Sequence, residues 1–162
     1  MQKITQIFIS DDNQEMGLQL KTNSNTLKDL FFEYKYYLYN NNSIEEFLIE
    51  HYPEDIINTY KKLKPYSYKC DFARYCILFK QGGWYFDLGL KVVNSIELEE
   101  TTNLVIFRDI NFFSQTSYAC APGIIYAQKE HKVLKKAIEM IVENTKNNFY
   151  GITPLCPTGP SL

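Results

Sequence analysis

The sequence lacks several features that would place it in a common class of protein. Its 162 residues carry 17 lysines and arginines against 19 acidic residues, a net charge of −2, so no cationic surplus exists for binding nucleic acid. No apolar run approaches the ~20 residues of a membrane span, and the N-terminus lacks the apolar stretch of a signal peptide. We therefore expect a soluble, cytoplasmic protein with no transmembrane segment and no nucleic-acid partner.

Metal-binding and disulfide patterns are also missing. The four cysteines, Cys70, Cys76, Cys120 and Cys156, form no C-x-x-C pair, and the chain has only two histidines that could join them. This spacing matches no common zinc site. Free thiols in a reducing compartment are the favoured interpretation, which agrees with the expected cytoplasmic location.

Aromatic residues, by contrast, are abundant. They make up 15% of the chain, with 13 tyrosines, 11 phenylalanines and one tryptophan. Tyrosine joins an apolar ring to a hydroxyl, which suits a cleft for a polar, ring-shaped ligand, although AT-rich codon usage would produce the same abundance. The length and the absence of repeats or linkers predict a single domain over residues 1–162.

Short apolar stretches alternate along the chain with amphipathic ones. Strands are predicted at residues 4–9, 34–39, 84–93, 104–107 and 124–127. Helices are predicted at 27–30, from Ser43 with a capping box to Glu46, from Pro53 to Leu63, at 68–81 after a Ser67 cap, and at 131–145. This order indicates an α/β fold with a mixed, mostly parallel sheet flanked by helices. In such sheets ligands bind at the carboxyl ends of strands, which makes the polar residues 10–13 a candidate binding segment.

The most informative part of the sequence is the helix predicted at 68–81. Asp71 and Arg74 lie three residues apart on it and therefore share a face. A carboxylate acceptor beside a guanidinium donor can hold the vicinal hydroxyls of a sugar. The same pair could be an exposed helix ion pair that contributes only a few tenths of a kcal/mol, and spacing alone favours this second interpretation.

A pair of glycines, Gly82-Gly83, ends this helix and turns the chain into the next strand. Alternation along that strand would place Asp87, Gly89 and Lys91 on one side of it. Carboxylates at both 87 and 89 could bind a Mg²⁺ or Mn²⁺ ion that bridges a diphosphate, but glycine replaces the second carboxylate. Only a weak metal site, with Asp87 as its ligand, is therefore expected.

This constellation resembles a known family, the glycosyltransferases with a DXD sugar-binding motif. The order and spacing of the family's hallmark residues are matched by Asp71, Arg74, Gly82, Gly83, Tyr85 and Asp87. The family includes bacterial capsule and lipopolysaccharide sugar transferases and yeast initiating mannosyltransferases, and clostridial glucosylating toxins share its core. Looser similarity extends over the chain, and residues 158–160 resemble a T-G-P element close to the family's active site.

The resemblance implies a GT-A-like (Rossmann-like) fold and transfer of a hexose from a UDP- or GDP-sugar to a glycan or other acceptor, with retention of anomeric configuration. It also implies the site residues. Donor-sugar contacts fall on Asp71, Arg74 and Asp87, and nucleotide contacts on Ile9, Ser10, Gly83 and Tyr85. Asp87 would meet the ribose, or Mn²⁺ or Mg²⁺ through water. Apart from the resemblance, Lys91 on the same strand side or Arg108 at a strand end could supply positive charge in place of the metal. No catalytic nucleophile is identified.

Two departures from the family pattern keep alternatives open. Gly89 stands where the second aspartate normally binds the metal, and the T-G-P element lies two residues before Leu162, where family members usually continue. We therefore expect either a chain lacking a C-terminal part or a naturally short relative. The alternatives to a transferase are a catalytically silent nucleotide-sugar or glycan-binding domain and an α/β interaction protein with no sugar ligand.

Overall fold

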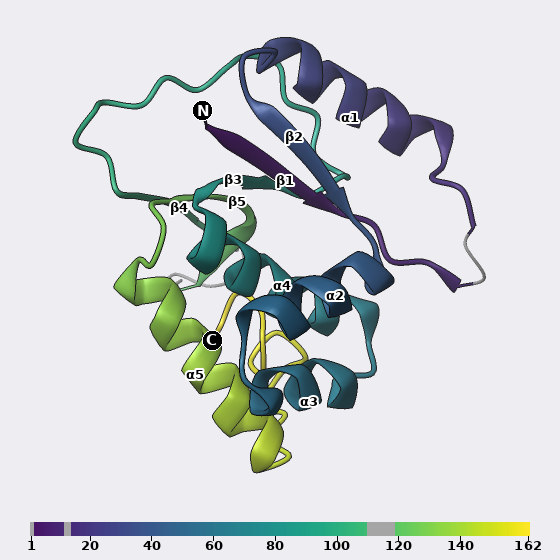
Figure 1. The fold of residues 1–162 in the computed structure, drawn as a ribbon, viewed down its shortest axis with the longest axis vertical. Coiled ribbons are helices and arrows are strands. Elements are labelled where there is room, and N and C mark those ends of the chain that lie inside the picture. Colours follow the sequence, from purple (N-terminus) through teal and green to yellow (C-terminus); the bar gives the residue numbers. More distant parts are fainter. Residues whose placement is uncertain (1, 12–13, 110–118) are drawn as a thin grey trace.

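The computed structural model describes residues 2–11, 14–109 and 119–162, which form an open sheet with helices on both faces (Figure 1). The strands are β1 (Lys3–Ile7), β2 (Lys35–Tyr39), β3 (Gly83–Phe86), β4 (Leu104–Arg108) and β5 (Cys120–Ala127). The helices are α1 (Leu18–Leu30), α2 (Asn41–His51), α3 (Glu54–Lys62), α4 (Tyr66–Gln81) and α5 (Lys132–Lys146). Every predicted strand and helix therefore has a counterpart, although several boundaries differ.

The sheet is mixed, as the sequence predicted. Its strand order is β2-β1-β3-β5-β4, with β1 parallel to both β2 and β3, and β5 antiparallel to both β3 and β4. All strands of this sheet except β5 therefore run in the same direction. The carboxyl ends of β1, β2 and β3 meet at one edge, which is where α/β sheets bind ligands.

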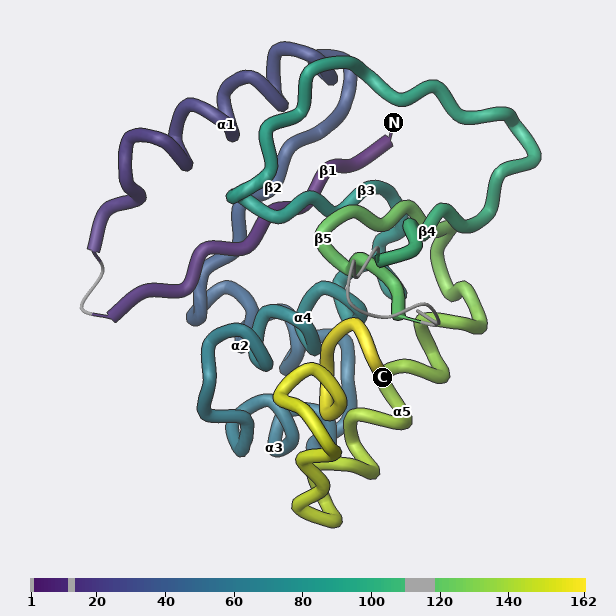
Figure 2. Tube along the Cα trace, turned by 180° about the vertical axis from the view of Figure 1, so that it is seen from behind, coloured from purple at the N-terminus to yellow at the C-terminus, as the bar shows by residue number. Residues whose placement is uncertain are grey.

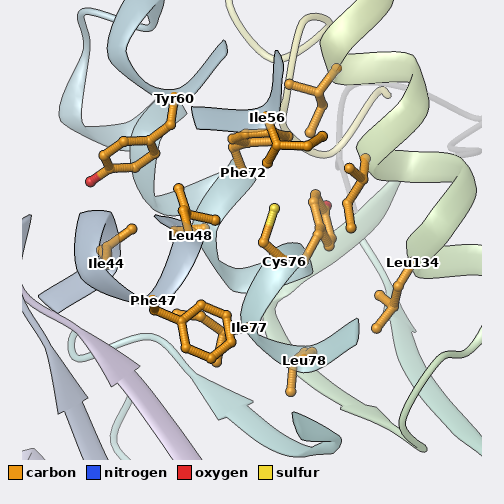
Figure 3. Close-up of a cluster of buried hydrophobic side chains, with 14 of the residues drawn as sticks. Ile44, Phe47, Leu48, Ile56, Tyr60, Phe72, Cys76, Ile77, Leu78 and Leu134 are labelled. Atoms are coloured by element: carbon orange, nitrogen blue, oxygen red, sulfur yellow. The ribbon is translucent and has the colours of Figure 1, made fainter. Parts of the chain in front are cut away.

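Helix α4 lies at the centre of the larger core. Its residues from 71 to 78 are all buried, because the sheet covers one side and α2, α3 and α5 pack around the others. The cluster in Figure 3 shows apolar side chains from these helices meeting around α4, with Phe72 and Cys76 at the middle. Packing on every side holds α4 rigidly against the sheet.

The opposite face of the sheet is covered by α1 and by the segment at 91–103 that precedes β4. Trp84 and Phe86 on β3 point to this face and pack with Leu27 and Phe31. Tyr85, between them on the strand, belongs to the core on the α4 side. The alternation predicted for β3 is correct over these three residues.

The first helix is much longer than the predicted 27–30. It begins at Leu18 and includes a polar stretch that has low intrinsic helix propensity. Tertiary hydrogen bonds explain why that stretch is helical: the buried Asn23 amide donates to the carbonyl of Leu88, and Ser24 shares a 2.8 Å hydrogen bond with the Tyr36 hydroxyl.

Two predicted helix caps are wrong. Helix α2 begins at Asn41, so its capping box joins Asn40 and Ser43 rather than Ser43 and Glu46. Helix α4 begins directly after Pro65, which places Ser67 inside its first turn. In both cases the helix starts before the residue that the sequence pattern indicated.

The strand predicted at 84–93 is also wrong in length. It ends at Phe86, and residues 87–90 form a turn in which the Leu90 amide donates to the Asp87 carbonyl at 3.1 Å. Asp87, Gly89 and Lys91 therefore do not lie along one side of a strand. The Gly82-Gly83 turn before β3 is as expected, with φ values of 65° and 99° that favour glycine.

None of the helices in the described ranges combines the length and the apolar character that crossing a membrane requires.

Candidate functional site

Three residues predicted to hold a sugar meet where α4 passes the end of β3. Nη2 of Arg74 lies 2.9 Å from Oδ1 of Asp71 and 3.4 Å from Oδ1 of Asp87. Asp71 comes from the helix one turn before Arg74, and Asp87 directly follows β3. The structure therefore joins these side chains in one group, which we call the acid–guanidinium cluster.

The cluster is buried, so the interpretation of Asp71 and Arg74 as an exposed ion pair is wrong. Their side chains are 12% and 5% exposed, whereas that of Asp87 is 43% exposed. Charges removed from water in this way need partners, because an unpaired buried charge costs several kcal/mol. Asp87 is the member of the cluster that remains accessible to a ligand.

Arg74 is held from several directions at once. Nη1 donates to the Pro122 carbonyl of β5 at 2.6 Å, and the guanidinium carbon lies 4.6 Å from the centre of the Tyr85 ring. A longer contact of 3.5 Å joins Nε to the Cys70 carbonyl. Because the guanidinium is planar, these contacts fix its orientation as well as its position.

Asp87 is oriented by β3 and β5. Its Oδ1 accepts a 2.6 Å hydrogen bond from the Tyr85 hydroxyl, and its backbone amide donates to the Gly123 carbonyl at 2.7 Å. Burial raises the pKa of Tyr85 well above its usual value, so this hydroxyl remains a donor. A Cβ at Gly123 would lie 2.9 Å from Oδ2 of Asp87, so glycine leaves room for the carboxylate.

Both carboxylate oxygens of Asp71 have a polar partner. Oδ1 meets Arg74, and Oδ2 accepts a 2.9 Å hydrogen bond from the hydroxyl of Thr158. Burial raises the pKa of Asp71 to about 6, against the opposing effects of Arg74 and of the Thr158 hydrogen bond. The carboxyl group therefore changes charge within the range in which many enzymes work.

A pocket of about 670 Å³ opens at the carboxyl ends of β1 and β2. It is lined by Phe8, Ile9, Ser10, Asp11, Gln14, Asn40, Asn41, Asn42, Tyr66 and Lys69, and we call it the strand-end pocket. Ile9 and Ser10 are the residues predicted to contact a nucleotide, while positions 12 and 13 of the candidate segment lie outside the described residues. Lys69 lies on α4 and its Nζ is 3.4 Å from Oδ1 of Asn41, another residue that lines the pocket.

The remaining predicted site residues are Gly83, Tyr85, Lys91 and Arg108. Tyr85 is fully buried beneath Arg74. Gly83 stands at the amino end of β3, where a Cβ would lie 2.4 Å from the Lys3 carbonyl oxygen, so its position is explained by backbone packing. Lys91 is exposed beyond the turn that follows Asp87, and Arg108 is exposed at the end of β4. The structure therefore places Tyr85 against the acid–guanidinium cluster and Gly83 at the other end of β3.

The described residues do not form a metal site by themselves. No group of three His, Cys, Asp or Glu side chains with the spacing of metal ligands occurs within 2–11, 14–109 and 119–162. One oxygen of Asp87 is already engaged by Arg74 and Tyr85, and Gly89 offers no side chain. Mg²⁺ and Mn²⁺ need several oxygen ligands, so this donor set falls short of holding either ion.

Sequence reasoning missed two groups of residues. Pro122 and Gly123 act through backbone carbonyls, and no side-chain pattern reveals such a role. Asn40, Asn41 and Asn42 line the strand-end pocket, and their position directly after a strand was a usable signal.

The chain belongs to a family of glycosyltransferases. The family model described as "Glycosyltransferase sugar-binding region containing DXD motif" matches residues 17–111, more than half of the chain. The predicted family is therefore confirmed, and the matched range contains all three residues of the acid–guanidinium cluster.

One relative in sequence and one solved structure are similar to this chain. Over 87 residues the chain is 36% identical to an uncharacterised glycosyltransferase of Acanthamoeba polyphaga mimivirus, a match that covers 54% of this chain and 34% of that protein. The fold resembles the solved structure of the PaToxG glycosyltransferase with a TM-score of 0.78 at 16% identity, over 98% of this chain and 65% of that chain. This likeness confirms the predicted GT-A-like fold. The chain spans about a third of the length of the viral relative it matches.

Proposed function

We propose that this chain binds a nucleotide sugar and transfers its hexose to a glycan or other acceptor, as in polysaccharide biosynthesis. The observation that supports this most is the buried acid–guanidinium cluster, which presents one half-exposed carboxylate after β3, at the same edge of the sheet as the strand-end pocket. Preorganised charges of this kind stabilise a transition state without the cost of reorienting during the reaction. The proposed donor is a UDP- or GDP-hexose, and the proposed stereochemical outcome is retention.

Each part of the site has a separate role in this proposal. Asp87, the accessible acid, meets the sugar or the ribose directly, while the buried Asp71 and Arg74 fix the geometry at the sugar end of the donor. Ile9 and Ser10 contact the nucleotide in the strand-end pocket, whose volume of about 670 Å³ is within the range of small-ligand sites. Positioning the acceptor hydroxyl near the anomeric carbon then supplies rate enhancement through proximity. We assign no nucleophile.

The proposal does not depend on a metal ion. Mn²⁺ or Mg²⁺ would neutralise the leaving diphosphate if the donor's own oxygens completed its coordination, and Lys91 or Arg108 are the candidate cations in its absence. The four cysteines are all free thiols, which supports a cytoplasmic location in the proposal.

Titration with UDP- and GDP-sugars, with and without Mn²⁺, tests the function. Release of free sugar or its transfer to an acceptor supports the enzyme, whereas binding without turnover would indicate a silent binding domain. Arg74→Lys keeps the positive charge but loses the planar fork, so we expect at least a tenfold loss of sugar-nucleotide affinity. Lys61→Arg, on the exposed surface of α3, is the matched control. Unchanged affinity in Arg74→Lys would contradict the site assignment.

The substitution Gly89→Asp tests whether turnover depends on a metal ion. Gly89 is exposed, and a Cβ built there meets no atom within 4 Å, so the position has room for a side chain to begin. We expect this substitution to create or strengthen Mn²⁺-dependent turnover, because it adds the second carboxylate. Gly89→Asn is the control, since it has a similar shape without the charge. Equal metal dependence in both variants would argue against a degenerate metal site.

A further inference from the structure

The C-terminal segment returns to the acid–guanidinium cluster and touches it through Thr158. In Figure 2 this segment (yellow) lies against α4 and α5, and its Pro160 is bonded to the start of β5. Thr158 is fully buried, and its hydroxyl donates to Oδ2 of Asp71 across 87 positions of the chain. If either partner were replaced by an apolar group, the other would be a buried polar group without a hydrogen bond, which lowers the stability of the folded protein.

Two neighbours of Thr158 secure the segment. A Cβ at Gly159 would lie 3.3 Å from Oδ2 of Asp71, so the backbone approaches the carboxylate closely. The Pro160 carbonyl accepts a 3.1 Å hydrogen bond from the amide of Cys120 at the start of β5. Because β5 also supplies the carbonyls that bind Arg74 and Asp87, the segment and the cluster share one support.

The contacts of Asp71 explain what the hydroxyl does. One carboxylate oxygen binds Arg74 and the other binds Thr158, so the plane of the carboxylate is set by both. Without the hydroxyl, Asp71 would be held on one oxygen only and could rotate. Arg74 would then lose a fixed partner on the helix, and Arg74 also contacts Asp87 at 3.4 Å.

We propose that Thr158 is a positioning residue: its buried hydroxyl fixes the Asp71 carboxylate so that the acid–guanidinium cluster is set for the sugar of the donor. This inference rests on the proposed function, because it assigns the cluster to the sugar end of a nucleotide sugar. It predicts a defect confined to that end. The nucleotide end, in the strand-end pocket, should not be affected.

Three variants test the proposal. Thr158→Val replaces the hydroxyl by a methyl group of similar size, and Thr158→Ser keeps the hydroxyl. Thr59→Val is the matched control, since Thr59 is also buried and its hydroxyl bonds to the Asp55 carbonyl on the distant α3. Affinities are measured by calorimetry for UDP-glucose, UDP-N-acetylglucosamine and GDP-mannose, and for UDP and GDP alone. Thermal unfolding of each variant is recorded in parallel.

We expect Thr158→Val to weaken the binding of the sugar nucleotide about 10- to 100-fold, because a hydrogen bond to a charged group is lost. Binding of UDP or GDP should change less than about twofold, and Thr158→Ser and Thr59→Val should stay near the wild-type protein for both ligands. A general structural defect would instead weaken both kinds of ligand equally.

Several outcomes would overturn the inference. Equal losses for sugar nucleotides and nucleoside diphosphates, no loss at all, or the same loss in Thr59→Val would each do so. If Thr158→Val does not fold, Thr158→Ala is measured in the same way and judged by the same ratio. A wild-type protein that binds neither kind of ligand would remove the proposed function and this inference together, whereas wild-type binding with an unaffected Thr158→Val removes this inference alone.

Discussion

The acid–guanidinium cluster and the strand-end pocket lie near the same edge of the sheet but differ in construction. In the cluster, the charged groups of Asp71 and Arg74 are buried and bonded to α4, β5 and the C-terminal segment. In the pocket, partly exposed amide, hydroxyl and amine side chains surround an open volume. One region is assembled before any ligand arrives, and the other is left to be filled.

This difference indicates that the two regions would select a ligand in different ways. A preorganised cluster discriminates between ligands by geometry, because its groups do not move to fit. An open pocket lined by short polar side chains selects mainly by size and by hydrogen bonding. Substitutions in the cluster should therefore affect folding and sugar recognition together, whereas substitutions in the pocket should affect binding alone.

Removing the centre of the cluster should have the largest effect. Arg74→Met leaves two carboxylates without their common partner, and breaking a buried ion pair typically costs about 3–5 kcal/mol. We expect a loss of that size in the free energy of unfolding, measured with urea. Lys61→Met on the exposed surface of α3 should change it by less than about 0.5 kcal/mol. A similar small change in Arg74→Met would mean that the cluster does not contribute to folding.

The pH dependence of stability should be the next largest effect. Burial raises the pKa of Asp71 from 3.8 to about 6, so the folded protein binds this proton more tightly than the unfolded chain does. That contribution is complete below about pH 4 and is lost as the pH rises through about 6. We expect the free energy of unfolding of the wild-type protein, relative to Asp71→Asn, to fall by roughly 2–3 kcal/mol between pH 4 and pH 7. A rise over the same range would show that Arg74 keeps Asp71 ionised.

Filling the strand-end pocket should separate binding from folding. Ser10→Phe places a ring in the pocket, and we expect it to lower the affinity for UDP or GDP at least about tenfold. The free energy of unfolding should stay within about 0.5 kcal/mol of the wild-type value, since Ser10 is not part of the core. Ser95→Phe, on the exposed segment before β4, is the control and should bind normally. Normal binding by Ser10→Phe would place the nucleotide elsewhere.

The smallest expected effect is on sugar-nucleotide affinity, and it comes from comparing alanine substitutions at two glycines. Gly123→Ala brings a methyl group to 2.9 Å from Oδ2 of Asp87 and should displace that carboxylate, whereas Gly89→Ala has open space around it. We expect sugar-nucleotide affinity to fall about threefold to tenfold in Gly123→Ala, corresponding to about 1 kcal/mol, and to be unchanged in Gly89→Ala. Equal affinity in both variants would mean that the orientation of Asp87 does not matter for binding.

Much of the fold could be predicted from local patterns. Apolar patterns, helix-start signals and turn residues placed a segment within each of the five strands and five helices of the described ranges, and paired glycines marked the turn into β3. The errors occurred where long-range contacts override local preference. Helix α1 extends through polar residues because Asn23 and Ser24 bond to distant partners, and β3 stops early because Leu90 closes a turn on Asp87.

The sequence by itself determined the α/β class, the family, and the identity of the charged residues in the cluster, because residue type and spacing along a helix are local properties. Only the tertiary structure decided that the ion pair is buried, that β5 supports it with backbone carbonyls, and that Thr158 reaches Asp71. Burial and backbone contacts depend on segments that are distant in the chain, so the spacing of side chains along one helix does not predict them.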